Sequence, residues 1–504
     1  VEIDAGHSLA KIHECDQNMI QKFDNFESLN CERLLAVEHN NCEEVPEHLA
    51  QMIEHLPAEL TDTQIKEIKQ IVCEYSDCFL KPDGKIGRTN IVEHSIELDN
   101  PHPIKLRYRD PPLHLREKVD TEIIRMQKEG LIEDSDSPFS APMVVVKKKS
   151  GDIRICCDYR KLNANTIKSA QNLPKISECL DSLSGAMYLC TLDCASGYHQ
   201  IGMKESDKHK TAFSTRLGLK QWKVMPFGLC NAPMTFTTCV QRLLYGLQWH
   251  NVLIYLDDCI CIGKNFAEMK AVLKQVLERF RQGNLLLKPS KCKLFQTSCD
   301  FLGFIVGRNG LKCDDRKISA IQNWPVCKNV KEVRQFVGFC QYYRRFIKGF
   351  SHICKPLHDL TKKNVRFKWS DECQNAFDTL KKAMSNPPVL SYPNEYDTFV
   401  LDTDASNFAA GACLSQIQDG VERPIAFGSK SFSKQQRNMC TTMRELCAII
   451  MFLAEYHIYL CSKKFILRTD HASLVWVTNF KNPDGKLFRW LQKLSSYAYE
   501  IQHR

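Results

Sequence analysis

The sequence predicts an α+β protein of several domains, and three observations support this. At 504 residues the chain has the length of about three or four domains. Between residues 89 and 324, strand-like runs alternate with helical segments. After the Asn-Pro-Pro break at 386–388, a second strand-rich module begins. The apolar fraction of 43% is that of an ordinary globular protein, so a packed core is expected in each part.

The elements divide the chain into four predicted stretches. Residues 1–60 have few strand signals and are expected to form an acidic extension, helical or partly disordered. A helix is predicted from Thr61 to Tyr75, with Thr61 and Gln64 as its N-terminal cap. The run 143–160 reads as a β-hairpin that turns at 150–152. Amphipathic helices are predicted at 330–350 and 370–384. The predicted domains are 1–60, 61–324, 325–395 and 396–504.

Charge is unevenly distributed. The first 60 residues hold thirteen acids against three Lys or Arg, a balance of −10, so the total of +9 leaves +19 for residues 61–504. A basic body of this kind suits a phosphate-rich partner. No apolar run approaches the roughly 20 residues of a membrane span. No pair among the 25 cysteines has CxxC spacing, so we expect free thiols. The chain lacks a signal segment and an initiator Met, so we expect an unsecreted piece of a longer protein.

Two adjacent acids are the first candidate site. Asp257 and Asp258 follow the apolar run 251–256, where neighbouring carboxylates stay ionised only if something positive neutralises them. On this dipeptide alone, an ordinary turn is an equally good interpretation. Asp193 also ends an apolar strand, so two strands lying side by side would bring the three acids together. We therefore predict a metal site, and magnesium is favoured because the ligands are hard oxygens.

Three basic clusters are candidates for phosphate contact, at 147–149, 288–293 and 342–345. Each alone is more often a solvated surface. In the last cluster two tyrosines precede two arginines, and rings beside guanidinium groups favour nucleic acid.

Ten sequence blocks, in order, closely resemble the Pol reverse transcriptase–ribonuclease H of gypsy-class (Metaviridae) LTR retrotransposons. The blocks are VKKKSGDIRICCDYRKLN, LDCASGYHQIGM, KTAFST, MPFGLCNAPMTF, YLDDCICIG, FLGFIV, VRQFVGFCQYYRRFIKGFS, LDTDAS, CTTMRELCAII and LRTDHASL. YLDD alone is a weak pattern, but the ordered set is very specific and covers roughly residues 89–504. The resemblance implies a right-hand polymerase with fingers, a ferredoxin-like palm and a helical thumb, followed by a ribonuclease H-like α/β domain truncated at its C-terminus.

The resemblance gives roles to residues in the polymerase part. It implies that Asp193, Asp257 and Asp258 are catalytic and hold two Mg²⁺ ions, with Mn²⁺ as a substitute. One ion would activate the primer 3′-hydroxyl and the other would bind the triphosphate of the incoming nucleotide. Tyr198 matches a steric gate against the 2′-hydroxyl, although core packing is the usual role of such a ring.

Further contacts follow from the same resemblance. Arg154 matches a fingers arginine that binds the triphosphate, and Lys147 is its expected partner. Phe227 lies in the MPFG loop near the nucleotide sugar, where retroviral relatives carry Gln. Nucleic-acid contacts are implied for a hairpin that grips the primer end and for the thumb, at Phe301, Gly303, Tyr343, Arg344 and Arg345.

In the last module, Asp404, Glu445 and Asp470 match three of the four carboxylates with which a ribonuclease H binds two metal ions. Asp402 is not expected to be a ligand. In the family the fourth acid lies beyond the position of Arg504, so we expect feeble or absent RNA hydrolysis by residues 1–504.

The implied function is an RNA-directed and DNA-directed DNA polymerase with an associated ribonuclease H domain. The implied partners are an RNA template, a DNA primer, RNA–DNA hybrid and deoxynucleoside triphosphates, with no membrane, within a larger Pol polyprotein. The expected location is a cytoplasmic virus-like particle, with the nucleus as an alternative, and a monomer and a homodimer both stay open. A catalytically dead or domesticated nucleic-acid-binding relic is the second class of function, but the intact set of polymerase acids favours the enzyme. An RNA-copying polymerase is a weaker third option.

Overall fold

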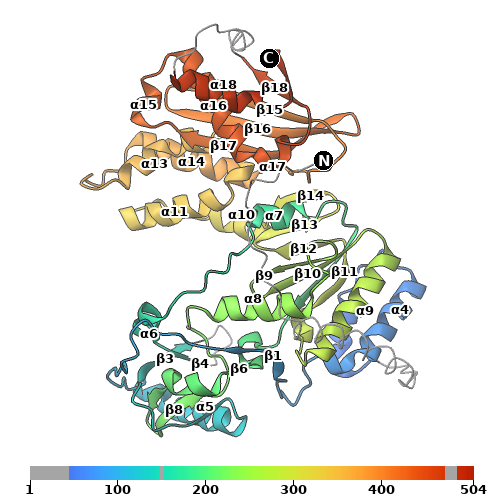
Figure 1. Ribbon diagram of the computed structural model, residues 1–504, viewed down its shortest axis with the longest axis vertical. Coiled ribbons are helices and arrows are strands. Elements are labelled where there is room, and N and C mark those ends of the chain that lie inside the picture. Colours follow the sequence, from blue (N-terminus) through green and yellow to red (C-terminus); the bar gives the residue numbers. More distant parts are fainter. Residues whose placement is uncertain (1–44, 148–152, 471–484, 504) are drawn as a thin grey trace, which may run out of the picture.

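The computed structural model describes residues 45–147, 153–470 and 485–503. Its buried apolar side chains form three hydrophobic cores, which follow one another along the chain in broad order. In Figure 1 the elements that contribute to the first core lie in the lower and middle parts of the molecule, those of the second core mostly above them and those of the third at the top. The expected α+β architecture of several domains is confirmed.

The N-terminal helices belong to the first core. They are α3 (Glu47–Glu54) and α4 (Asp62–Glu74). The predicted capping box is present, because Thr61 and Gln64 exchange side-chain and backbone hydrogen bonds. Leu49 and Met52 are buried in the same hydrophobic core as the apolar residues of α4 and of the sheets that follow it. A separate extension over residues 1–60 is therefore wrong for the part from 45 onward, because its apolar side chains are needed to fill this core. Residues 1–44 lie outside the described residues.

The lower part is a five-stranded sheet of order β2-β8-β7-β3-β4. Strands β3 and β4 form the predicted hairpin, whose turn at 148–152 lies outside the described residues. The elements here are β1 (Thr89–His94), η2 (Leu113–Leu115), α5 (Arg116–Lys128), β2 (Ile132–Asp134), β3 (Ala141–Lys147), β4 (Ile153–Cys157), α6 (Arg160–Asn165), β6 (Ile201–Met203), η4 (Glu205–Thr211), β7 (Phe213–Thr215) and β8 (Gly218–Trp222).

The middle part is a four-stranded sheet of order β11-β5-β10-β9, with α8 and α9 packed against it (Figure 1). Two ion pairs join α9 to α4: Lys270 to Glu67 at 2.6 Å and Lys274 to Glu74 at 2.8 Å. The elements are η1 (Ser76–Cys78), β5 (Tyr188–Asp193), η3 (Gly197–Gln200), α8 (Ala232–Leu243), β9 (Val252–Tyr255), β10 (Asp258–Gly263), α9 (Phe266–Gln282), η5 (Pro289–Lys291) and β11 (Lys293–Gln296).

The second core lies between a three-stranded sheet and a group of helices. The predicted helix at 330–350 ends early, at Tyr342, because a 3₁₀ turn follows and Gly349 is left-handed at φ 68°. The helix predicted at 370–384 is confirmed as α14. The elements are α7 (Ile176–Asp181), β12 (Ser298–Phe301), β13 (Phe304–Gly307), β14 (Gly310–Cys313), α10 (Asp315–Gln322), α11 (Val330–Tyr342), η6 (Arg344–Phe346), α12 (Phe350–Ile353), α13 (Lys355–Leu360) and α14 (Asp371–Ser385).

The third core is covered by a five-stranded sheet of order β17-β16-β15-β18-β19. Strand β15 is antiparallel to β16 and parallel to β18, so an α/β domain follows the break at 386–388 as expected. The elements are β15 (Phe399–Ala405), β16 (Ala409–Gln418), β17 (Val421–Ser431), α15 (Lys434–Arg437), α16 (Thr441–Glu455), α17 (His457–Leu460), β18 (Phe465–Thr469), α18 (Gly485–Ser495) and β19 (Tyr499–His503).

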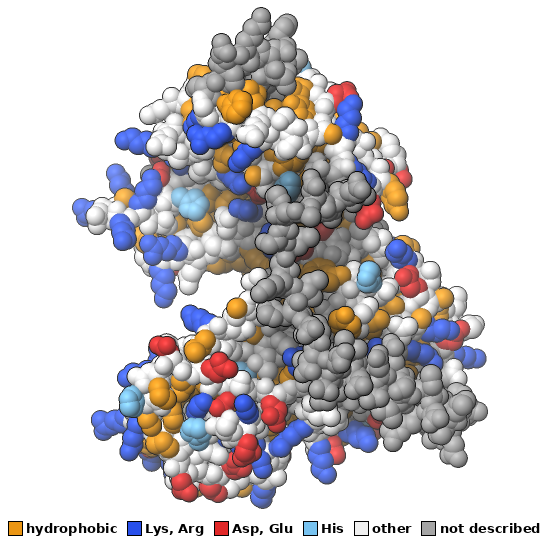
Figure 2. All heavy atoms as spheres, viewed as in Figure 1, with side chains coloured by type: hydrophobic (Ala, Val, Ile, Leu, Met, Phe, Trp, Pro, Cys, Tyr) orange, Lys and Arg blue, Asp and Glu red, His pale blue; other side chains and the backbone are white. Residues whose placement is uncertain are grey.

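The surface is deeply notched on one side. Figure 2 shows the hollow between the lower sheet and the helices of the second core, with Lys and Arg side chains on both lips. In the part of the chain that the structure describes, no helix is both long enough and apolar enough to cross a bilayer, and none of the cysteines there is in a disulfide.

Candidate active sites: two carboxylate centres

The first centre lies at one end of the middle sheet. Asp258 opens β10 and pairs directly with Asp193, the last residue of β5. Strands β9 and β10 are joined by a tight turn in which Leu256 takes φ 54°, and this turn carries Asp257. The strand pairing predicted from the two apolar runs is therefore present, and it gathers the three acids.

Burial and mutual repulsion both act on these acids. The pKa of Asp257 is raised by burial first and then by Asp258 and Asp193, and the pKa of Asp258 is raised by burial and by Asp193. Lys291 opposes both shifts, and its Nζ lies 2.9 and 3.1 Å from the two carboxylate oxygens of Asp193. A site that already attracts one ammonium group, and that offers only hard oxygen ligands, fits a divalent cation.

A buried glutamine fixes the loop that follows Asp193. Gln200 is fully buried, and its side-chain amide donates to the carbonyl oxygens of Ala195 and Leu286, both at 2.9 Å. Its Oε1 accepts from the Leu286 N–H at 2.7 Å. The Lys288 N–H donates to the carbonyl oxygen of Asp193 at 2.8 Å. These hydrogen bonds join the loop after Asp193 to the distant segment 286–288. The sequence analysis did not single out Gln200.

Tyr198, Phe227 and Arg154 lie together beside this centre. The rings of Tyr198 and Phe227 stack with centroids 5.1 Å apart, and the Arg154 guanidinium carbon lies 5.4 Å from the Phe227 ring centre. Burial, and then Asp257, raise the pKa of Tyr198 to about 12. Tyr198, Phe227 and Arg154, which come from separate sequence motifs, therefore form one wall of the palm site. Strand β3 ends at Lys147, whose side chain lies outside the described part of the structure.

The second centre lies at the carboxyl ends of two parallel strands. Asp404 is on β15 and Asp470 directly follows β18, and the register pairs Thr403 with Thr469 just before them. Glu445 comes from α16. Carboxylate oxygens of Asp404, Glu445 and Asp470 all lie within 4.8 Å of one another, and this is the only such cluster in the described residues.

Glu445 is the most perturbed acid of the second centre. It is 3% exposed, its Oε1 accepts from the Ala405 N–H at 3.1 Å, and its Oε2 has no hydrogen-bond partner. Burial, then Asp470 and Asp404, raise its pKa to about 7. An orphaned buried oxygen beside two further carboxylates fits a divalent cation. Asp402 instead lies 3.9 Å from Arg468, in line with its exclusion from the predicted ligands.

Known families match the two parts of the chain that carry these centres, although the second match ends before Asp470. A profile described as reverse transcriptase (RNA-dependent DNA polymerase) matches residues 146–306, and one described as an RNase H-like domain found in reverse transcriptase matches residues 369–467. The Pol polyprotein of Drosophila melanogaster transposon 412 is 35% identical over 90% of this chain and 37% of its own length. The chain thus carries reverse transcriptase and RNase H-like domains and is similar to gypsy-class retrotransposon Pol polyproteins.

Other retrotransposon polyproteins give the same match. The Pol polyprotein of D. melanogaster transposon 297 is 34% identical over 88% of this chain and 42% of its own length. The Tf2-3 polyprotein of Schizosaccharomyces pombe is 33% identical over 82% of this chain and 31% of its own length. The chain thus spans less than half the length of these relatives.

The fold is that of retroviral reverse transcriptases. A foamy viral protease-reverse transcriptase solved with double-stranded DNA has a TM-score of 0.81 at 20% identity, over 93% of this chain and 98% of that one. A second foamy viral structure, with an RNA/DNA hybrid, has a TM-score of 0.76 over 91% of this chain and 62% of that one. In these terms the lower sheet is the fingers, the middle sheet the palm and the second-core helices the thumb.

The predicted nucleic-acid contacts need correction. Phe301 and Tyr343 are 3% and 2% exposed, so their rings fill the second core and are not available to a ligand. The Arg345 side chain, 16% exposed, lies against Asp181. Arg344 pairs with Glu455 at 3.4 Å but is 45% exposed, so its nucleic-acid contact stays a prediction. The sequence pattern of rings and arginines is the same for a nucleic-acid surface and for a domain interface, and only burial separates them.

Gly303 lies in the hairpin of β12 and β13. Leu302 and Gly303 form the turn between β12 and β13, both with positive φ, at 50° and 76°. The hydroxyl groups of Tyr342 and Tyr343 donate to the carbonyl oxygens of Leu302 and Gly303, at 2.6 and 2.9 Å. The thumb therefore holds this hairpin by its backbone.

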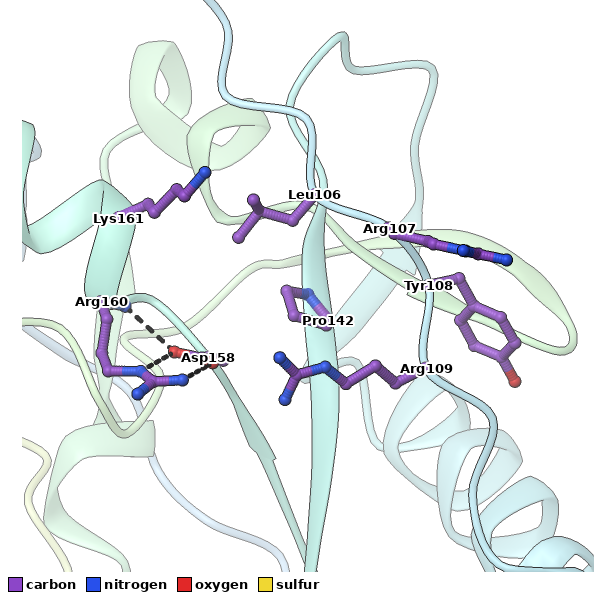
Figure 3. A pocket seen from close by; sticks show the side chains of 8 residues that line it. All are labelled: Leu106, Arg107, Tyr108, Arg109, Pro142, Asp158, Arg160 and Lys161. Atoms are coloured by element: carbon purple, nitrogen blue, oxygen red, sulfur yellow. Dashed lines mark hydrogen bonds and ion pairs between the residues drawn. The ribbon is translucent and has the colours of Figure 1, made fainter.

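A basic pocket in the fingers was missed by the sequence analysis. Its volume is about 560 Å³, and Figure 3 shows Arg109 and Arg160 pointing toward each other across it. Asp158 pairs with Arg160 at 2.6 Å, which lowers the pKa of that acid to about 2. The eight residues that line it are Leu106, Arg107, Tyr108, Arg109, Pro142, Asp158, Arg160 and Lys161. Its basic groups come from two distant segments, so no single sequence cluster marks it.

Proposed function

We propose that this chain copies RNA, and DNA, into DNA from deoxynucleoside triphosphates. The observation that carries the proposal is the register of β5 and β10, which places Asp193 opposite Asp258 with Asp257 in the adjoining turn. Similarity to the retrotransposon Pol polyproteins and the wall of Tyr198, Phe227 and Arg154 support it.

The three palm acids would hold two Mg²⁺ ions, with Mn²⁺ as a substitute. When bound, such ions activate the primer 3′-hydroxyl and neutralise charge on the reacting phosphates. Arg154 is exposed beside the site and can donate two hydrogen bonds to a triphosphate. Tyr198 is backed by Phe227 and Phe236, at 5.1 and 5.7 Å between ring centres, so its ring cannot easily move away from a 2′-hydroxyl.

We propose that the second centre cuts the RNA strand of a hybrid. Asp404, Glu445 and Asp470 would bind divalent cations that activate water. The Ala405 N–H holds Glu445 Oε1, which leaves Oε2 for a ligand.

The substrate path would follow the notch in Figure 2. Two foamy viral relatives in fold were solved with double-stranded DNA and with an RNA/DNA hybrid, which supports a duplex in the corresponding place. We propose that the fingers pocket of Figure 3 holds template phosphates, because Arg107, Arg109 and Lys161 line it beside the neutralised Asp158.

Primer extension on an RNA template tests the proposal. Wild-type protein should extend the primer with deoxynucleotides, and Asp257→Asn should reduce the rate on the order of 10³-fold or more while hybrid binding is kept. Asp419→Asn is a matched control, since this acid lies on an exposed turn at φ 52° that asparagine adopts readily.

One result would favour a nucleic-acid-binding relic over an active polymerase. If wild type and Asp257→Asn bind the hybrid equally and neither extends the primer, the chain is a nucleic-acid-binding relic. If the wild type incorporates ribonucleotides as fast as deoxynucleotides, the assigned role of Tyr198 is wrong.

A further inference from the structure

The tyrosine-arginine segment at 342–346 joins three parts of the chain. Arg345, on η6 of the thumb, places its Nη2 3.4 Å from Oδ1 of Asp181, the last residue of α7. The hydroxyl of Tyr459, on α17 of the RNase H-like domain, donates to Oδ2 of the same carboxylate. The Arg345 Nη2 also lies 3.4 Å from the carbonyl oxygen of Ile425 on β17. Asp181, Arg345 and Tyr459 are called the clamp below.

The clamp is buried. Side-chain exposure is 13% for Asp181 and 16% for Arg345. Burial raises the pKa of Asp181, and Arg345 and Tyr459 act against that shift. The Nε of Arg345 is buried without a hydrogen-bond partner. A buried ion pair with an unsatisfied donor adds little net stability, but removing one partner leaves the other charge stranded. Such a pair fixes the relative position of the elements that it joins more than it adds to the free energy of unfolding.

The neighbouring arginine makes a different kind of contact. Arg344 pairs with Glu455 at 3.4 Å and is 45% exposed, and Lys430 reaches the same glutamate at 2.8 Å. An exposed pair of this kind contributes little. Adjacent arginines on one turn thus form a buried and an exposed contact with the same domain, which makes Arg344 a natural control for Arg345.

Further contacts in the same interface hold strand β17. The Ser351 N–H, on α12, donates to the Ser429 side chain at 2.9 Å, and the Ser391 N–H donates to the Pro424 carbonyl at 2.8 Å. Phe427 of β17 packs against the second core. Strand β17 is therefore held by the thumb along much of its length.

We propose that Arg345 is a positioning residue that, through Asp181 and Tyr459, fixes the RNase H-like centre at one distance from the palm centre. The length of hybrid between the primer end and the RNA cut is then set by the clamp. The contacts of the clamp do not depend on the proposed function. Their effect on the length of hybrid between the primer end and the RNA cut does rest on the proposed function of the two centres.

The 504-residue chain with Arg345→Met, Asp181→Asn or Tyr459→Phe tests the clamp, and Arg344→Met is the control. Hydrogen–deuterium exchange of the ligand-free protein needs no activity, and the first three variants should exchange about tenfold faster at β17 and α17 while the palm sheet is unchanged. Arg345→Lys should restore part of the protection. Tyr459→Phe removes a single hydroxyl and should fold even where a charge change does not.

A hydroxyl-radical footprint on a primed hybrid reads the position of the domain. Wild type and Arg344→Met should give one sharp border at the RNase H-like end, and Arg345→Met should blur it over several nucleotides. Where RNA is cut, the cuts should spread by the same amount, with polymerase activity kept. A sharp border in Arg345→Met overturns the positioning role, even if exchange is faster. A wild type that binds hybrid with a sharp border but neither extends nor cuts overturns the proposed function and leaves the clamp supported.

Discussion

The two carboxylate centres are assembled in different ways. In the palm, Asp193 and Asp258 face each other across one antiparallel strand pair, and the Lys291 ammonium lies at 2.9 Å from Asp193. In the RNase H-like domain, three acids from two strands and a helix converge to within 4.8 Å. Burial and the two neighbouring acids raise the pKa of Glu445 to about 7.

The difference shows two solutions to the repulsion between clustered acids. The palm places a lysine beside its acids, so the carboxylates are partly neutralised before any cation binds. At the second centre the three carboxylates lie close together, and the raised pKa of Glu445 favours its protonated form instead. Cation binding should therefore depend more strongly on pH at the second centre.

The largest expected effect separates the two centres by activity. Asp258→Asn should reduce primer extension on the order of 10³-fold or more, because a carboxylate that holds cations is lost. Asp404→Asn should leave extension within about twofold, since it lies in another domain. Steady-state extension rates on a primed RNA template measure both. Equal losses in the two variants would show that the centres act as one unit.

The next effect concerns sugar selection at the palm. Tyr198→Ala should raise ribonucleotide incorporation relative to deoxynucleotide on the order of 10²-fold, because the ring that excludes the 2′-hydroxyl is gone. Tyr198→Phe keeps the ring stacked on Phe227 and should keep the discrimination. The ratio of kcat/KM for the two nucleotides is the measurement. A large change in Tyr198→Phe would assign the discrimination to the hydroxyl group.

The pH dependence of cation binding sharpens the comparison. Glu445 must lose its proton to become a ligand, so Mn²⁺ affinity at the second centre should rise about tenfold per pH unit up to about 7 and level off above it. Electron paramagnetic resonance titrations in an Asp193→Asn/Asp258→Asn background isolate this centre. Glu445→Gln should flatten the profile.

The same shift has a consequence for stability without cations. The folded-state pKa of Glu445 is raised, so the stability from its protonated form is present below its usual pKa and is lost as pH rises through about 7. Thermal unfolding should therefore respond more to added Mg²⁺ at pH 8 than at pH 6. An equal response at both pH values would place the effect elsewhere.

The smallest effect compares two glycines near the first acid of each centre. A Cβ on Gly197 would lie 2.6 Å from Phe236 Cε2, whereas one on Gly411 would meet only the Asp404 carbonyl at 3.9 Å. Gly197→Ala should cost about 1–2 kcal/mol of unfolding free energy and disturb the neighbouring Tyr198. Gly411→Ala should change stability by less than about 0.5 kcal/mol. Denaturant titration checks both, and a costly Gly411→Ala would contradict the open space found there.

Local patterns in the sequence were sufficient for the features that depend on neighbouring residues. The capping box of Thr61 and Gln64, the hairpin of β3 and β4, and the placing of acids at strand ends all follow from short-range chemistry. The palm acids could be predicted from apolar strands that end in carboxylates, which are rare without a reason, whereas Asp404, Glu445 and Asp470 were assigned from the family resemblance.

Burial and long-range pairing were decided only by the tertiary structure. The sequence alone could not show that Gln200 joins segments 86 residues apart, or that Arg109 and Arg160 meet in one pocket. It also predicted nucleic-acid contacts at Tyr343 and Arg345, which are buried in the protein. A sequence fixes the chemical groups and their local conformation, but which surface covers a ring or a charge depends on packing between distant elements.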